Sequence, residues 1–362
     1  PLLEGVDKVE TPHGSACVID RAFDAGDFHG AARVEAYAAY DPEALQVLSG
    51  RPLGLGEAAG AAGPVFLDLE TTGLSGGAGT VAFLVGLGAF EADGRFRTRQ
   101  FFLGGFAGER AMLHAVAEAV EGRPLVITYN GGSFDLPVME TRWLFHRLAP
   151  ALEGRPHFDM LPPARRLWRD TMSGGERSCR LVALEEALLG FRRVGDVPGF
   201  EIPSRYFEFL RTGDPEPLEP VLLHNRLDLL SLAVFTARAQ RLVREGPPAS
   251  SDARECLALG RIYERAGRAE AAEAAYRAAV DHPVCDRASC EHAWYALARL
   301  LRRRKRHGEA AQAWRQLLRH ADRRSAAPPP SESTTTSARI RSPRRVRSSV
   351  VPGRTMSDEA PA

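Results

Sequence analysis

The spacing of apolar and polar residues predicts strands and helices in a definite order. Segment 65–73, VFLDLETTG, begins with an apolar run that is typical of a buried strand. Segments 80–90 and 96–103 are rich in Val, Phe and Leu, and the ADG between them predicts a hairpin, so three strands form a meander. The pattern then predicts a helix at 107–121, a strand at 125–129, a helix at about 134–148, a helix closed by Gly190 and a long helix at about 218–244.

Mixed antiparallel strands followed by helix, strand and helix predict an α/β domain with a mixed sheet flanked by helices. We expect it at residues 64–245, after a lead-in at 1–63 that contains short β-like pieces. Beyond the boundary at EGPPASSD, two helical hairpins resemble each other at a spacing of 38 residues, as Leu259 and Leu297 show. They predict a small all-α region at 252–321 similar to tetratricopeptide repeats, which packs on the main domain or needs a partner. The remainder, 322–362, has almost no core formers and is predicted to be disordered.

Composition limits the class of protein. The 362 residues are 44% hydrophobic and 26% charged, as is ordinary for a soluble globular protein. A net charge of +1 excludes a global attraction to nucleic acid or membrane, so a basic surface must be local. Five cysteines without a C-x-x-C pair predict free thiols in a reducing compartment, and no apolar run approaches about 18 residues. We therefore expect a cytoplasmic protein without a membrane span. The first residue, Pro1, is typical of a truncated or incomplete reading frame.

Asp68 and Glu70, at the end of the first predicted strand, pose an electrostatic problem. Strand side chains alternate, so the two acids lie on one face, one pleat apart. Carboxylates about 4 Å apart repel by roughly 4 kcal/mol at an effective dielectric near 20, and burial adds a desolvation cost. A divalent metal, or an Arg or Lys from elsewhere in the chain, would balance them, unless one acid merely caps the following turn. The glycines of TTGLSGGAGT are not a phosphate-binding loop of the Walker type, because its Lys is absent.

Two later segments carry further acids. In NGGSFD, Asp135 follows a strand and opens a helix. It either reaches a crevice at the carboxyl end of that strand or serves as a first-turn acid favoured by the helix dipole. In HNRLD, His224 and Asp228 are four residues apart, on one face of a helix that leucines surround. Burial requires that both have partners, and the two can satisfy each other.

The order and context of these segments resemble a known family. VFLDLETTG, YNGGSFD and HNRLD are similar to the three exonuclease motifs of the DEDD group of ribonuclease-H-like nucleases, whose acidic positions fall on Asp68, Glu70, Asp135 and Asp228. More closely, GGAGTVAFLVGLG, YNGGSFDLPVMETR, DVPGFEIPSRYFEFLRTGD and HNRLDLLSL resemble the bacterial YprB-like ribonuclease-H-like domain over about residues 10–245. The helical repeats are also a feature of that family, and the tail beyond about 322 is not.

The resemblance implies metal-dependent phosphodiester chemistry. Four carboxylates can hold two Mg²⁺ or Mn²⁺ ions, which stabilise the attacking and leaving oxygens of an in-line displacement. We expect Asp68 to bridge both ions, Glu70 and Asp228 to help bind one of them, and Asp135 to act directly or through water. His224 is expected to orient or deprotonate the attacking water. Exonucleases of this group carry a His five residues before the last Asp or a Tyr four before it, whereas this chain has a His at the Tyr spacing.

Candidate substrate contacts lie in or after these segments. The residues expected to bind nucleic acid are Asn130, Phe134, Arg142, Arg165 and Arg166, with Arg169 as a further phosphate contact and Trp168 as an alternative stacking residue. The alternative is that surface arginines on helices bind nothing specific. Asp159 is a reserve metal ligand, or else it caps the helix that follows it.

Two clusters in the repeat region could also carry chemistry. His282, Cys285, Cys290 and His292 are candidate zinc ligands, but their spacing does not match a zinc finger and a loop between helices accounts for them. The basic run 302–307 is accounted for by solvated charges at a turn.

The leading hypothesis is a metal-dependent nuclease that acts as a 3′-to-5′ exonuclease on single-stranded DNA or RNA. The second is a catalytically weak or inactive nucleic-acid-binding adaptor whose repeats recruit a protein partner. A third is an endonuclease specific for branched or hybrid duplexes.

Overall fold

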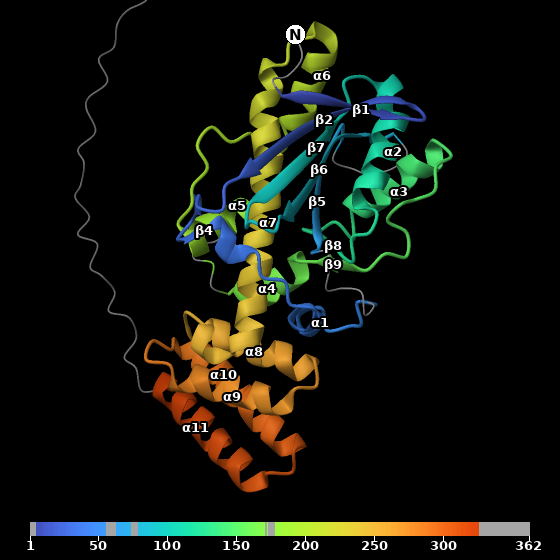
Figure 1. Ribbon diagram of the computed structural model, residues 1–362. Helices are drawn as coiled ribbons and strands as arrows, with labels where there is room; N and C mark the ends of the chain where they lie inside the picture. The colour runs from blue at the N-terminus through green and yellow to red at the C-terminus, as the bar shows by residue number, and fades with distance from the viewer. Residues whose placement is uncertain (1–4, 56–62, 74–78, 171, 173–177, 326–362) are drawn as a thin grey trace, which may run out of the picture. The chain divides into compact units, whose positions relative to one another are not determined.

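A seven-stranded mixed sheet forms the centre of the protein (Figure 1). The computed structural model describes residues 5–55, 63–73, 79–170, 172 and 178–325. The strand order is β1-β2-β7-β6-β5-β8-β9, in which β5, β8 and β9 are parallel and the other neighbours antiparallel. The bounds are β1 (Val6–Thr11), β2 (Gly14–Phe23), β5 (Val65–Thr71), β6 (Ala82–Phe90), β7 (Phe96–Phe102), β8 (Val126–Thr128) and β9 (His157–Asp159). The predicted meander of three strands is β5-β6-β7.

Helices cover both faces of this sheet. Those at 109–120, 135–145 and 219–245 lie close to their predicted positions, whereas those at 42–49 and 202–212 were not predicted. The helices are α1 (Pro42–Ser49), α2 (Glu109–Val120), α3 (Asp135–Phe145), α4 (Leu161–Trp168), α5 (Leu181–Leu184), α6 (Ile202–Thr212) and α7 (Glu219–Glu245). A π-helical turn, η4 (Glu185–Leu189), continues α5 and ends at Gly190, whose left-handed φ of 63° suits a glycine. The α/β fold with a flanked mixed sheet and a following helical region is therefore confirmed. In the described part of the chain, none of the helices has the length and apolar character needed to span a membrane.

β5 is buried on both faces, which explains its almost continuous apolar run. Leu67 packs in the core that α2 and α3 build on one face of the sheet. Phe66 packs in the core on the opposite face, together with Leu229 and other residues of α7. Side chains alternate along a strand, so Asp68 and Glu70 lie on the α7 side with Phe66.

The N-terminal segment contributes to this sheet. Its strands β1 and β2 extend the meander, because β2 pairs with β7. A short hairpin of β3 (Phe28–His29) and β4 (Ala32–Arg33) follows. The lead-in expected at 1–63 thus supplies two strands of the main sheet, while the domain boundaries themselves stay predictions. Residues 74–78 of the glycine-rich segment and the tail beyond 325, which is predicted to be disordered, lie outside the described residues.

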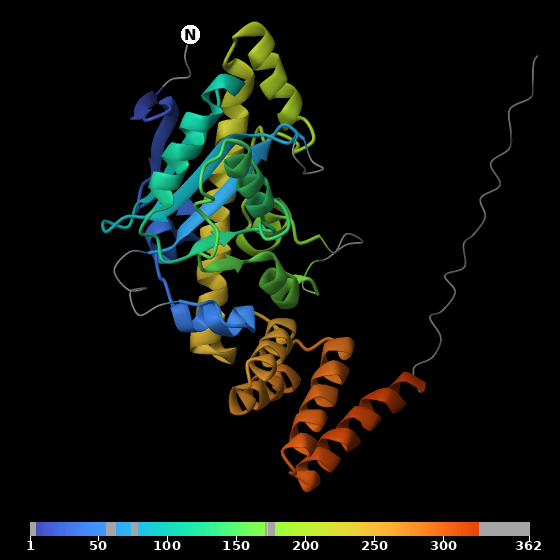
Figure 2. The ribbon, with the colours of Figure 1, turned by 90° about the vertical axis from the view of Figure 1, so that its right-hand side faces the viewer.

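Four helices follow α7, in the order expected of two hairpins (Figure 2). They are α8 (Ala253–Arg265), α9 (Ala269–Asp281), α10 (Arg287–Arg303) and α11 (His307–Ser325), and α9 packs on both α8 and α10. Positions that match between the hairpins are buried alike, for example Ala272 and Ala310. α8 and α9 approach closely at Gly260, where a Cβ would lie 2.4 Å from the Tyr276 ring. The helical region is confirmed, and its tetratricopeptide identity stays a prediction.

The expectation of five free thiols is wrong for two of them. Cys285 and Cys290 form a disulfide where the loop after α9 enters α10, while Cys17, Cys179 and Cys256 are free. The sequence spacing did not predict this pair, because a disulfide depends on the distance between the two residues in the folded chain. Two of the four candidate zinc ligands, Cys285 and Cys290, are therefore bonded to each other.

The basic run at 302–307 is largely compensated by acids of the neighbouring helices. Arg303 pairs with Glu264, Arg304 with Glu270, and Arg306 with Glu273 and Glu309. These ion pairs tie the turn between α10 and α11 to α8 and α9. The interpretation as surface charges at a turn therefore holds for this run, with acidic partners that the sequence did not specify.

Candidate active site

Asp68 is held in place by a hydrogen-bonded chain across three strands. The register pairs Asp68 with Gly86 on β6, and Gly86 with Gln100 on β7. Asn225 of α7 lies over this row: its Nδ2 donates to Asp68 Oδ2 at 2.7 Å, and Gln100 Nε2 donates to Asn225 Oδ1 at 2.8 Å. A Cβ on Gly86 would come within 2.3 Å of Asn225 Oδ1. The glycine is therefore required for α7 to reach the carboxylate.

The acids predicted from the sequence converge on this point. Asp135 is the first residue of α3, after the loop that follows β8, and is only 7% exposed. Burial, followed by the charges of Asp228 and Asp135, raises the pKa of Asp68 well above its ordinary value. Burial and the charges of Asp68 and Asp228 likewise raise the pKa of Glu70. The site therefore concentrates more negative charge than the protein around it balances.

The pKa of Asp135 is raised to about 7. Burial is the main cause, and the charge of Asp159 adds to it, while backbone hydrogen bonds from Asp135 and Leu69 act in the opposite direction. Asp135 is thus a member of the charged site, although it also has the first-turn position that the alternative interpretation gave it.

His224 and Asp228 lie side by side on α7, as their spacing predicts, but they are not each other's main partners. His224 Nδ1 lies 2.6 Å from Asp196 Oδ1, whereas His224 Nε2 lies 3.6 Å from Asp228 Oδ2. With Asp196 accepting the Nδ1 proton, Nε2 of a neutral ring is an acceptor that faces Asp228. Asp196 was missed from the sequence, although it is the first residue of the DVPGF segment that carries the family resemblance.

Arg193 supplies the cation that the rest of the chain was expected to provide. Its Nη2 donates to Asp228 Oδ1 at 2.5 Å and to Glu185 Oε1 at 2.6 Å, and its Nε donates to Glu185 Oε2 at 2.8 Å. The Arg193 side chain is 1% exposed and Glu185 is fully buried in the turn η4. Ion pairing with Glu185 and Asp228 raises the pKa of Arg193 despite its burial. No local pattern in the sequence indicated that Arg193 approaches α7.

A buried chain of hydrogen bonds connects Arg193 to the N-terminal segment. Ser231 of α7 donates to Glu185, and His29 Nε2 lies 2.9 Å from Ser231 Oγ. His29 is 2% exposed, and burial together with the charge of Arg193 lowers its pKa from 6.5 to about 4. The β3–β4 hairpin thus supports the residue that orients Asp228.

The pKa of His29 predicts an acid-sensitive contribution to stability. The folded pKa lies below the unfolded value of 6.5, so the unfolded chain binds the extra proton first. The contribution is complete above about pH 6.5 and is lost as the pH falls toward 4, by about 2 kcal/mol between pH 7 and pH 5. We expect urea unfolding to show a smaller loss between these pH values in His29→Gln than in the wild type. Equal losses in both proteins would contradict the assignment.

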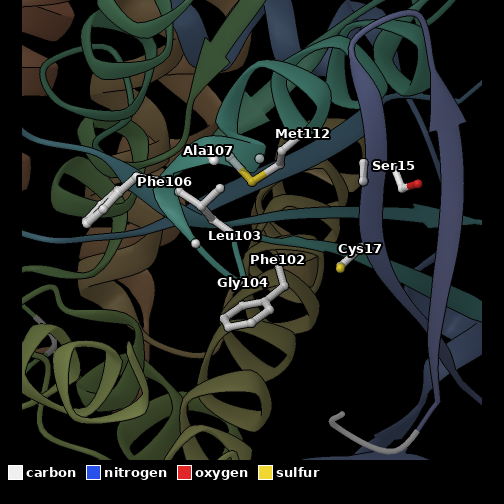
Figure 3. A pocket seen from close by; sticks show the side chains of 11 residues that line it. Ser15, Cys17, Phe102, Leu103, Gly104, Phe106, Ala107 and Met112 are labelled. Carbon is white, nitrogen blue, oxygen red and sulfur yellow. The ribbon is translucent and has the colours of Figure 1, made fainter. Parts of the chain in front are cut away.

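One large cavity joins the acids to basic side chains. It has a volume of about 1110 Å³, and Asp68, Asp196, His224 and Asp228 line its acidic part. Its other lining residues include Asn130, Arg165, Arg169, Arg180 and the exposed Phe200. A second cavity, of about 410 Å³, lies between β2 and the segment from Phe102 to Met112 (Figure 3). It has no charged lining residue, so it does not share this chemistry.

The predicted nucleic-acid contacts divide into two groups. Asn130 and Arg165 line the large cavity, whereas Phe134 and Arg166 do not. The expectation for Arg142 is corrected, because its side chain is buried and bound to Glu109 through two hydrogen bonds of 2.6 Å. Trp168 is also corrected as a stacking residue: it is fully buried and donates to Glu255 at 2.9 Å.

The Asp159 carboxylate accepts backbone hydrogen bonds at the start of α4 and at Asn130, and its role as a reserve metal ligand stays a prediction. Its Oδ1 accepts from Leu161 N at 3.0 Å at the start of α4 and from Asn130 N at 2.8 Å. The second bond fixes the turn at Asn130, which has a positive φ of 69°. Asp159 thus shapes the loop that leads into α3.

Carboxylate oxygens are the ligands that Mg²⁺ and Mn²⁺ prefer, so the donor set fits the predicted ions by its chemistry. The raised pKa values of Asp68, Glu70 and Asp135 point the same way, since a divalent cation would relieve the repulsion. Within the residues described, however, no three His, Cys, Asp or Glu side chains are grouped closely enough to hold one ion.

Comparison with known proteins agrees with this geometry. Residues 65–240 match the RNase_H superfamily. The chain is also 32% identical over 255 residues to a protein of Bacillus subtilis (strain 168) named "Uncharacterized protein YprB". That similarity covers 70% of this chain, which spans about 60% of the length of the relative. The superfamily match contains the four predicted acids and His224, whereas the helices from α8 onward lie beyond it.

Proposed function

We propose that this protein hydrolyses phosphodiester bonds of nucleic acid with the help of two divalent metal ions, because residues 65–240 match the RNase_H superfamily. The proposed activity is that of a 3′-to-5′ exonuclease on single-stranded ends. One observation carries the proposal: acids from β5 and α7 line the same cavity as His224, and Arg165, Arg169 and Arg180 line another part of it. Acids that bind metal and arginines that bind phosphate are the parts that phosphodiester hydrolysis requires.

The ions would be Mg²⁺ or Mn²⁺ held by Asp68, Glu70, Asp135 and Asp228, and they would supply stabilisation of the attacking and leaving oxygens. Asn225 orients the Asp68 carboxylate, and Arg193 orients that of Asp228. Arg165 and Arg169, which line the same cavity, are placed to neutralise phosphates of the substrate.

His224 is proposed to take a proton from the attacking water. Its Nδ1 faces Asp196, so Nε2 of the neutral ring is the basic atom and lies on the side of Asp228. Asp196 is a positioning residue, because it acts by fixing the tautomer and orientation of the ring. This arrangement gives a function to a His at a spacing where related exonucleases carry a Tyr.

Replacing His224 by Ala should reduce kcat by about 10²-fold or more, because it removes the proton acceptor. The Mg²⁺ concentration that gives half-maximal activity should change little, since the four carboxylates remain. Steady-state kinetics at a series of Mg²⁺ concentrations checks this. Asp196→Asn should lower kcat by less and shift the pH profile of kcat, as expected if it only positions the ring. An unchanged kcat in His224→Ala would make the residue a packing element.

A second candidate function is nucleic-acid binding without turnover. It is favoured by the hydrogen bond of Arg193 to Asp228 and by the lack of a ready group of three metal ligands in the described residues. The two functions differ in one assay: end-labelled single-stranded DNA and RNA are incubated with Mg²⁺, Mn²⁺ or EDTA. Stepwise shortening that EDTA abolishes supports the exonuclease, and binding without shortening supports the adaptor. Cleavage of closed circular substrates would instead indicate an endonuclease.

A further inference from the structure

A basic cleft lies between α4 of the sheet domain and α8, the first helix of the C-terminal region. Its volume is about 380 Å³. It is lined by Arg165, Arg166, Arg169, Asp170, Arg261, Ile262 and Arg265. Among the described lining residues, five arginines face a single aspartate, so these residues carry a net positive charge.

The arginines of the cleft come in pairs at helical spacing. Arg165 and Arg169 are four residues apart on α4 and its end, and Arg261 and Arg265 are four apart on α8. All four side chains are exposed. Among the residues that the structure describes, none of the four pairs with a carboxylate, in contrast to the arginines of the turn between α10 and α11.

These pairs have no evident role in stabilising the fold. Like charges four residues apart on a helix destabilise it by about 0.2–0.5 kcal/mol. Two such pairs opposite each other add repulsion between α4 and α8. Arg166, half-buried between them, donates to Leu48 O at 3.0 Å, and burial together with the charge of Arg265 lowers its pKa. An anionic ligand bound between these arginines would attract each of them and so offset their mutual repulsion.

The cleft is continuous with the candidate active site. Arg165 and Arg169 line both the cleft and the large cavity that contains Asp68 and Asp228. A chain of phosphates that has one end at the acids would therefore pass these two arginines and reach Arg261 and Arg265. The lining residues that the structure describes include no aromatic side chain, so they are suited to contacts with the phosphate backbone and not to base stacking.

We propose that the cleft between α4 and α8 binds the phosphate backbone of a single-stranded nucleic acid whose end lies in the acidic cavity. The first helix of the C-terminal region is then part of the substrate-binding surface. This inference rests on the proposed function for the identity of the strand, but it concerns binding and can be measured without turnover. Arginine suits such a site because its planar guanidinium binds phosphate through two hydrogen bonds.

The test compares two double variants that remove equal charge at equal spacing. Arg261→Gln with Arg265→Gln changes the cleft, and Arg315→Gln with Arg319→Gln changes two exposed arginines of α11 outside it. Fluorescence anisotropy in EDTA measures binding of a labelled single strand of about 20 nucleotides. The cleft variant should bind about tenfold more weakly, and the slope of log Kd against log salt should fall by about 1.4, or about 0.7 for each lost phosphate contact. The α11 variant should behave as the wild type.

Strand length gives an internal control. An oligonucleotide of about four nucleotides can fill the acidic cavity without reaching α8, so the cleft variant should bind it as tightly as the wild type. Circular dichroism melting of both variants should match the wild type, because all four substituted side chains are exposed.

Two results would overturn the inference. Equally weakened binding of the labelled strand by both double variants would indicate general charge attraction. Polyglutamate that displaces the labelled strand as effectively as an unlabelled oligonucleotide does would indicate a site for acidic protein. The proposed function fails separately. If the cleft variant loses long-strand binding but the wild type never shortens its substrate, the cleft inference stands and the exonuclease is rejected. If the wild type shortens its substrate but the cleft variant binds long strands as tightly as the wild type, the exonuclease stands and the cleft inference is rejected.

Discussion

Asp68→Asn should abolish most of the metal-dependent hydrolysis, with a loss of about 10²- to 10³-fold or more in kcat. The substitution keeps the size of the side chain and an oxygen that can still accept from Asn225, so the local hydrogen bonds survive. It removes the charge that lies at the centre of the acidic group. Time courses of end-labelled oligonucleotides with Mg²⁺ or Mn²⁺ measure the effect.

The same variant should be more stable than the wild type in EDTA. Burial and neighbouring carboxylates raise the pKa of Asp68, which means that its charge is unfavourable in the folded protein at neutral pH. A neutral Asn removes this cost, so the thermal midpoint should rise, while the stabilisation by added Mg²⁺ should shrink. Asp93→Asn, at an exposed hairpin, is the matched control and should change neither activity nor the response to Mg²⁺. Full activity in Asp68→Asn would reject the proposed metal site.

Arg193→Met should lower the free energy of unfolding by about 3–5 kcal/mol. Methionine keeps much of the volume of the side chain but leaves Glu185, which is fully buried, without its cation. Asp228 also loses its hydrogen bond from Arg193, so activity should fall together with stability. Urea unfolding at pH 7 measures the free energy.

The neighbouring residue offers a matched control. Arg192 pairs with Glu186 at the surface, where the two side chains are 78% and 60% exposed, so Arg192→Met should cost less than about 0.5 kcal/mol. Adding Glu185→Gln to Arg193→Met should recover part of the loss, because the uncompensated buried charge is removed. If Arg192→Met and Arg193→Met cost the same, the buried network is not the source of the stability.

Local order could be predicted from the sequence because its physical causes are local. Alternation in β5 places Asp68 and Glu70 on one face, and a separation of four residues places His224 beside Asp228 on α7. The turn residues ADG predicted the hairpin of β6 and β7, and the leucines of 218–244 predicted α7. The order and context of the acidic segments, through their resemblance to the DEDD exonuclease motifs, indicated that these acids converge.

The partners of those residues could be decided only by tertiary packing. Arg193 reaches Asp228 and Asp196 reaches His224 from the segment after the π-helical turn, and Asn225 reaches Asp68 because Gly86 leaves room for it. Arg142 and Trp168 are residue types that often contact nucleic acid, but their side chains are buried against Glu109 and Glu255. The basic cleft likewise exists because α8 packs beside α4. Helical and strand periods specify which residues share a face, whereas charge pairing between distant segments depends on distances that only the folded chain defines.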